Sequence, residues 1–177
     1  MQRLCVSCRL RKDVNQLLPF SIGTHGSLEL GRGRRTAWVC IKKSCLLSIE
    51  KSPQKTFRSL RAEIKKPVHS LQQAKNFIKK QIYKHLSHAQ RSGNVYSGHS
   101  KIITHQKKIF FILLSELSQN LFYWKKTLPN INIITTDSSP QELGLIIKKG
   151  SRSVLGISPN RYAQKLLKYL QHYKELR

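Results

Sequence analysis

The stretch KIFFILLS, residues 108–115, decides the fold of the C-terminal part of the chain. It is short, apolar and aromatic, and polar residues bound it. A run of this length is typical of a strand buried on both faces, because buried helices usually extend over ten residues or more. The sequence therefore predicts a sheet with this segment in its interior.

The segments around this strand alternate between helical and extended patterns. Apolar residues from Leu71 to Ala89 recur at every third or fourth position, which predicts an amphipathic helix that stops near Gly93. Ser138 or Ser139 can cap a helix with Pro140 in its first turn. Further helices are predicted at about 98–106, 117–127, 140–149 and 160–176, a second buried strand at 132–135 and a last strand at 153–157. This alternation predicts an α/β sandwich.

The first 61 residues have a different pattern. Four glycines between residues 23 and 33 separate short apolar pieces, which predicts a small meander of strands. A helix is predicted from about Ser44, with an interruption at Pro53. The polar, basic segment RAEIKKPVH, residues 61–69, marks a boundary. We predict two domains, 1–61 and 71–177, joined by a linker at 62–70.

Charge limits the class of partner. Thirty-three Lys and Arg residues against eight Asp and Glu residues give a net charge of +25, which attracts polyanions. A membrane-spanning helix needs about 20 apolar residues, whereas the longest apolar run, 109–114, has six. The first dozen residues contain no apolar stretch typical of a signal peptide. These features predict a cytoplasmic protein that binds nucleic acid and takes no small-molecule substrate.

The four cysteines form two close pairs that lie far apart in the sequence. Cys5 and Cys8 have two residues between them, and Cys40 and Cys45 have four. Two such pairs match the needs of a tetrahedral zinc site that staples a small domain. Buried thiols that pack as small apolar groups are the alternative, and a redox pair at Cys5 and Cys8 is a further one. A structural zinc ion is the one cofactor that the sequence suggests.

The cysteines lie within a recognisable pattern. RLCVSCRLRK at 3–12, the pair Leu17–Leu18, and RTAWVC at 35–40 followed by Cys45 resemble the bacterial YlxR family over about residues 3–61. The resemblance implies a small α+β domain that binds nucleic acid. Independently of it, basic side chains beside glycine-containing turns can approach phosphate together with backbone amides. The candidates are Arg9, Arg11, Lys12, Arg32, Arg34 and Arg35.

Three segments of the second part also carry a resemblance. RSGNVYSG at 91–98, ILLSELS at 112–118 and QELGLIIKKGSRSVLGI at 141–157 look like YlxQ, a bacterial member of the kink-turn-binding ribosomal protein superfamily, over about residues 71–172. This implies a three-layer α/β/α sandwich with a mixed central sheet. It also implies RNA binding through the turn before the second helix and the loop before the last strand. Ser100 and Lys101 stand where the superfamily's kink-turn readers carry an asparagine–glutamate pair, so the carboxylate that would accept hydrogen bonds from guanine is missing.

The chemistry of those two places also suits RNA. A glycine at a helix start leaves amides facing outward, and serine hydroxyls can reach base edges or 2′-hydroxyls. Ordinary turn chemistry is the alternative. The candidate residues are Arg91, Gly98, Ser100 and Lys101 at the first place, and Lys149, Gly150, Ser151, Arg152 and Ser153 at the second. Tyr96, which we place in a turn between glycines, is the candidate for stacking on a base.

Patterns typical of enzymes are missing from the sequence. The carboxylates form no close pair, the histidines have no carboxylate or cysteine at ligand spacing, and no phosphate-binding glycine loop occurs. The sequence therefore predicts a non-enzymatic RNA-binding protein of the bacterial translation or RNA-processing machinery. Ribosomal RNA or ribonuclease P RNA are its targets by analogy, and the ribosome or ribonuclease P its partners. A DNA-binding nucleoid-type protein or transcriptional regulator is the first alternative, and an RNA-modifying enzyme the second.

Overall fold

The computed structural model describes residues 1–61, 63–65, 68–118 and 120–177. It divides into two compact units: unit 1, Met1–Lys79 with Gln171–Arg177, and unit 2, Lys80–Leu170. The sequence placed the boundary at 62–70, whereas the observed division falls within a helix. Residues 62, 66 and 67 of that predicted linker, and residue 119 of the predicted helix 117–127, lie outside the described residues.

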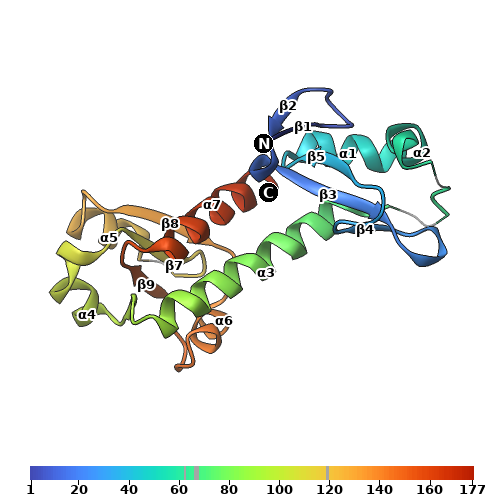
Figure 1. The fold of residues 1–177 in the computed structure, drawn as a ribbon. Helices are drawn as coiled ribbons and strands as arrows, with labels where there is room; N and C mark the ends of the chain where they lie inside the picture. Colours follow the sequence, from blue (N-terminus) through green and yellow to red (C-terminus); the bar gives the residue numbers. More distant parts are fainter. Residues whose placement is uncertain (62, 66–67, 119) are drawn as a thin grey trace. The chain divides into compact units, whose positions relative to one another are not determined.

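Unit 1 contains two small antiparallel sheets. β1 (Gln2–Leu4) pairs with β2 (Arg11–Asp13), and β3 (Leu17–Ile22) lies between β4 (Leu28–Leu30) and β5 (Ala37–Cys40), as Figure 1 shows. The short strands expected here are present. Their order, β4-β3-β5, is not a meander, because β5 returns to the other side of β3. Short 3-10 turns, Val14–Gln16 and Thr24–Gly26, join the strands.

Helices follow β5 where the sequence predicted them. α1 (Lys43–Lys51) ends before Pro53, which opens α2 (Pro53–Thr56), and a 3-10 turn, Arg58–Leu60, follows. Leu46 and Ile49 of α1 are fully buried, and the ring of Phe57 lies 5.8 Å from that of Phe20 on β3. Burial of these apolar side chains is what holds the helices onto the sheet.

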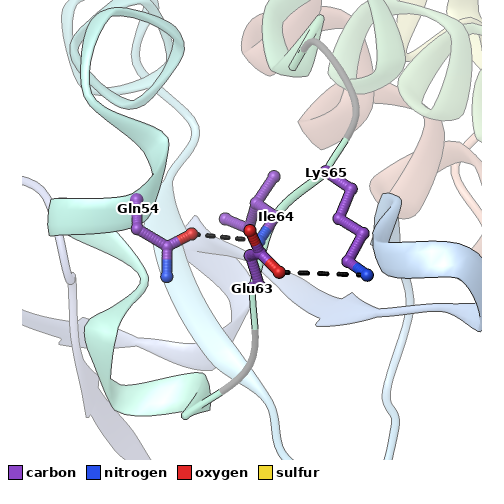
Figure 2. A network of polar contacts seen from close by, with 4 residues as sticks. All are labelled: Gln54, Glu63, Ile64 and Lys65. Carbon is purple, nitrogen blue, oxygen red and sulfur yellow. Dashed lines mark hydrogen bonds and ion pairs between the residues drawn. The ribbon is translucent and has the colours of Figure 1, made fainter.

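The chain after α2 is tied back to unit 1. Figure 2 shows the backbone amide of Ile64 donating to Oε1 of Gln54 at 3.0 Å, beside an exposed ion pair between Glu63 and Lys65. The amide of Lys65 also donates to the carbonyl of Gly26 at 3.1 Å. Residues 63–65 are thus attached to unit 1.

The long amphipathic helix is confirmed as α3 (Ser70–Arg91). Its predicted apolar stripe is buried, and the lysines off the stripe are exposed or half-buried. The buried members of the stripe are Ala74, Ile78, Ile82, Leu86 and Ala89.

Unit 2 is built on a four-stranded mixed sheet with the order β6-β9-β7-β8. Only the pair β7 and β8 is parallel among the described strands. The predicted buried strand is β7 (Phe111–Ser115), and all five of its residues are buried. β9 (Val154–Ile157) is also buried throughout. The mixed central sheet is therefore confirmed.

Two strands differ from expectation. β8 (Asn132–Thr136) was predicted to be buried, but it lies at the sheet edge and only Thr136 is buried. β6 (Val95–Ser97) was not predicted, because three residues before a glycine read as a turn. Tyr96 therefore lies on a strand, where its ring stacks on His105 at 4.6 Å.

The helices of unit 2 are shorter than predicted. α5 (Leu121–Thr127) begins four residues later than expected, and α6 (Pro140–Ile146) ends three earlier. Ser139 caps α6: its hydroxyl accepts from the amide of Glu142, whose carboxylate accepts from the amide of Ser139. The remaining helices are α4 (His99–Thr104), followed by a 3-10 turn at Gln106–Lys108, and α7 (Arg161–Glu175), whose residues from Gln171 onward belong to unit 1. Within the described parts of the chain, no helix has the length and apolarity needed to cross a bilayer.

Candidate nucleic-acid interface

The first bend of unit 2, residues 97–101, joins β6 to α4. Gly98 has φ 95°, a backbone conformation that favours glycine, although among the described residues other than its chain neighbours no atom lies within 4 Å of the position a Cβ would take. No side chain caps the helix that follows, and Ser100 and Lys101 are exposed on its first turn. The backbone conformation, and not lack of space, is the reason for glycine here.

The second bend, residues 147–153, joins α6 to β9 and packs on α6. A Cβ on Gly144 would lie 2.3 Å from the carbonyl oxygen of Gly150, so a side chain at Gly144 would force this bend to move. Gly150 itself is uncrowded: its nearest neighbour would be Nη1 of Arg152 at 3.8 Å. Two backbone hydrogen bonds fix the bend, from the amide of Lys149 to Gly144 at 2.9 Å and from the amide of Arg152 to Pro140 at 2.8 Å.

The two bends meet. Nζ of Lys149 donates to the hydroxyl of Ser97 at 3.3 Å. Beside this contact is a cleft of about 370 Å³. It is lined by Gly98, His99, Asn120, Tyr123, Trp124, Ser151, Arg152, Ser153 and Val154. The sequence-predicted residues Gly98, Ser151, Arg152 and Ser153 therefore lie around a single cavity.

Aromatic side chains form one wall of this cleft. His99 lies 5.2 Å, between ring centroids, from both Tyr123 and Trp124, and its Nε2 is hydrogen-bonded to the hydroxyl of Tyr123. Trp124 is buried, whereas Tyr123 is 42% exposed. Sequence reasoning missed His99, Asn120 and Tyr123 as cleft residues, since no local signal links the start of α4 to α5.

Arg152 has an unpaired donor in the cleft wall. Its Nη1 donates to the carbonyl of Ser151 at 2.8 Å. Its Nε is buried and has no hydrogen-bond partner among the described residues. A buried donor without an acceptor is costly, so an acceptor on a bound molecule would relieve this cost.

Other predicted residues of unit 2 lie outside the cleft lining. Arg91 is exposed at the end of α3, where its guanidinium contacts Nδ1 of His88 at 3.2 Å. Lys101 follows Gly98 by one helical turn and is exposed. Lys149 and Gly150 belong to the second bend without lining the cavity.

The basic candidates of unit 1 fall in two regions, the β1–β2 hairpin and the loop between β4 and β5. Arg9 has a left-handed φ of 61° in the turn between β1 and β2, and Arg11 and Lys12 follow on β2. Arg32, Arg34 and Arg35 lie on the loop between β4 and β5. The guanidinium of Arg32 lies 5.4 Å from the centre of the Trp38 ring, and Nη1 of Arg35 donates to the carbonyl of Leu60 at 3.4 Å. Arg34 lines two hollows of about 360 and 390 Å³.

The four cysteine sulfurs of unit 1 come together as a cluster that can hold a metal ion. All four Sγ atoms lie within 4.8 Å of one another. Sγ of Cys8 lies 3.7 Å from Sγ of Cys40, and the backbone amide of Cys40 donates to the sulfur of Cys5 at 3.3 Å. Cys5, Cys40 and Cys45 are buried, whereas Cys8 is exposed.

Burial and crowding within the cluster oppose ionisation of two of its thiols, those of Cys40 and Cys45. Burial, together with the neighbouring Cys5 and Cys8, raises the pKa of Cys40, and the same causes raise the pKa of Cys45 to about 11. Burial also acts to raise the pKa of Cys8, but hydrogen bonds from the Leu10 backbone and the other three cysteines lower it overall. A divalent cation would remove this mutual repulsion by binding the thiolates.

Comparisons with known proteins find partial structural similarity. No family model and no curated protein matches the sequence. A solved protein of unknown function from Bacillus halodurans is 18% identical, with 52% of this chain and 97% of that chain covered at a TM-score of 0.47. The Giardia lamblia 15.5kD RNA binding protein is 8% identical, with 56% of this chain and 90% of that chain covered at a TM-score of 0.45. The chain is thus similar in part to solved structures that include these two.

Proposed function

We propose that this chain is a non-enzymatic RNA-binding protein of the bacterial translation or RNA-processing machinery, acting in the cytoplasm. Structured RNA docks on the cleft of unit 2, whose mixed sheet forms the centre of a three-layer α/β/α sandwich. The observation that carries the proposal is the meeting of the two bends, which puts Gly98 and Ser151–Ser153 around one cavity. Ribosomal RNA and ribonuclease P RNA are the target classes, by analogy with the families the sequence resembles.

The charge of the chain favours a polyanionic partner. Thirty-three basic residues against eight acidic ones leave a net charge of +25. Phosphates supply the missing anions, and their binding releases condensed counterions.

The cleft offers a group for each part of a nucleotide. The Arg152 guanidinium suits phosphate, the hydroxyls of Ser151 and Ser153 suit a 2′-hydroxyl or a base edge, and the exposed part of the Tyr123 ring suits stacking on a base. The buried Nε of Arg152 gains its missing acceptor if a phosphate oxygen binds there.

The shape of this site favours RNA over DNA. Duplex DNA is read by a helix or ribbon that enters a groove. The site of unit 2 is instead a concavity, which suits an unpaired, splayed nucleotide of folded RNA. A DNA-binding nucleoid-type or regulatory protein stays the alternative. Tighter binding to duplex DNA than to folded RNA at one fixed salt concentration would favour it.

The substitution Arg152→Gln tests the cleft. We expect a loss of RNA affinity of about 10-fold, because a charge-assisted hydrogen bond is removed. The plot of log K, the association constant for RNA, against log salt concentration should become less steep by about one, which corresponds to the loss of one phosphate contact. Both are measured by titrating labelled RNA at several salt concentrations.

Arg161→Gln is the matched control. Arg161 carries the same charge, is exposed on α7 of unit 2 and does not line the cleft. We expect its affinity to stay within about two-fold of the wild type. Equal losses in the two variants would mean that charge alone, and not the cleft, binds RNA.

We also propose Zn²⁺ as the ion of the cysteine cluster, in a structural role. Four thiolates at about 2.3 Å from zinc lie about 3.8 Å apart in a tetrahedron, close to the 3.7 Å between Cys8 and Cys40. The amide that donates to Cys5 is a typical outer contact of a metal-bound thiolate. Elemental analysis of protein purified under reducing conditions should find one zinc per chain. Protein without stoichiometric metal would contradict this assignment.

A further inference from the structure

We propose that Cys8 is an oxidation site and that peroxide joins it to Cys40 in a disulfide, which opens the metal cluster. The inference rests on the proposed zinc site and adds a chemical reaction to it. The co-reactant is hydrogen peroxide, which the structure does not contain and the surroundings must supply.

Accessibility selects Cys8 as the reacting sulfur. Cys8 is exposed, while the exposed fractions of Cys5, Cys40 and Cys45 are 0%, 1% and 5%. Oxidation of cysteine follows accessibility and thiolate character. A peroxide molecule therefore reaches the cluster through Cys8.

Proximity points to Cys40 as the partner, among three cysteines whose sulfurs all lie within 4.8 Å of that of Cys8. The structure records a direct contact of 3.7 Å between the sulfurs of Cys8 and Cys40, so a shift of less than 2 Å brings them to the bond length of about 2.05 Å. The sulfur of Cys5 instead accepts a hydrogen bond from the amide of Cys40. Cys8 lies in the turn between β1 and β2, whose flanking residues Leu4 and Leu10 are exposed.

The two steps balance in atoms and electrons. The Cys8 thiolate attacks one peroxide oxygen: an S–O bond forms, the O–O bond breaks and hydroxide leaves. The Cys40 thiolate then attacks the Cys8 sulfur: the S–S bond forms, the S–O bond breaks and a second hydroxide leaves. The two sulfurs together lose two electrons, which reduce the peroxide, and the buffer protonates both hydroxides to water. With two of its four thiolates consumed, the cluster no longer retains the metal.

The test uses the full-length chain, zinc-loaded and reduced, with hydrogen peroxide added up to one equivalent. Zinc release is followed with a chromogenic chelator, and disulfides are mapped by peptide mass spectrometry after free thiols are blocked. Trypsin leaves Cys5 and Cys8 together on Leu4–Arg9, Cys40 on 36–42 and Cys45 on 44–51. Fragmentation of Leu4–Arg9 then distinguishes Cys8 from Cys5.

We expect one zinc released per peroxide consumed, a disulfide from Cys8 to Cys40, and recovery with a dithiol reductant and zinc. A disulfide between Cys5 and Cys8, a link to Cys45, or full retention of zinc overturns the inference. Reduced protein that carries no zinc overturns both this inference and the zinc site, whereas zinc that is bound and retained overturns this one alone. RNA affinity is measured separately, so the proposed RNA binding by the cleft is tested independently of the cysteine cluster.

Two variants make the test specific. Cys8→Ser and Cys45→Ser each remove one metal ligand, so both weaken the site to a similar extent. Only Cys8→Ser should abolish the peroxide-induced disulfide, and Cys45→Ser should still form it. Loss of the disulfide in both variants would contradict the pairing. If either variant fails to fold, zinc is removed from wild-type protein with a chelator and its disulfides are mapped after peroxide treatment. The expected disulfide is again the one between Cys8 and Cys40.

Discussion

Units 1 and 2 stabilise their strands in different ways. In unit 2, Phe111 to Leu114 of β7 are fully buried between β8 and β9, so apolar burial holds the sheet together. In unit 1, no residue of β1 or β2 is buried, and Leu4 and Leu10 are 44% and 55% exposed. An isolated two-stranded hairpin is marginal in water. The β1–β2 hairpin is attached instead through the buried Cys5 and the hydrogen bond from the amide of Val6 to Trp38. Apolar burial therefore accounts for the sheet of unit 2, whereas we expect the hairpin of unit 1 to depend on its sulfur cluster.

Metal removal should have the largest effect and should be confined to unit 1. The free energy of zinc binding at a structural site is about 10–16 kcal/mol. This is comparable to the free energy of unfolding of a whole domain, about 5–15 kcal/mol. After chelation we expect amides of residues 2–13 to lose their protection from hydrogen exchange, while amides 111–115 keep theirs. A hairpin that stays protected without metal would mean that its few contacts are sufficient.

A core truncation should affect unit 2 alone. Leu113 is 0% exposed on β7, so Leu113→Ala should lower the free energy of unfolding of unit 2 by about 3 kcal/mol. Leu145→Ala is the matched control, because Leu145 is 76% exposed on α6 and its loss should cost less than about 0.5 kcal/mol. Urea unfolding followed by hydrogen exchange measures both. Similar costs would contradict the assignment of β7 to the core.

The smallest effect expected concerns the second bend. Gly144→Ala places a methyl group against the carbonyl of Gly150 and should cost about 1–3 kcal/mol, with weaker RNA binding because the bend moves. Gly150→Ala meets no crowding and should change stability by less than about 0.5 kcal/mol. Thermal unfolding and RNA titration of the pair test this. Equal effects would mean that Gly150 needs its own conformational freedom.

Local patterns predicted the elements whose environment matches their sequence. The stripe of α3 and the apolar run of β7 were found because their periodicity and length follow directly from which face is buried. β8 was assigned to the interior from its apolar residues, yet it pairs on one side only and lies at the edge. The three residues of β6 are too few for their pattern to distinguish a strand from a turn. Their pairing with β9 is what makes them a strand.

The same limit applies to the candidate site. Gly98 and Ser151–Ser153 were identified from residue type and from a resemblance, but their meeting depends on the pairing of β6 with β9. His99, Tyr123 and Trp124 were not among the candidate residues. Their contacts join residues more than 20 positions apart, which no local signal predicts.

The amino-acid sequence by itself determined the net charge, the two cysteine pairs and the amphipathic and buried segments, because these depend on residue type and short-range spacing. Only the tertiary structure decided that four sulfurs share one cluster, that β8 is an edge strand and that two basic bends surround one cleft with Tyr123. The physical reason is that strand pairing and packing bring together residues far apart in the chain. Their proximity is a property of the whole fold and is not encoded in any one segment.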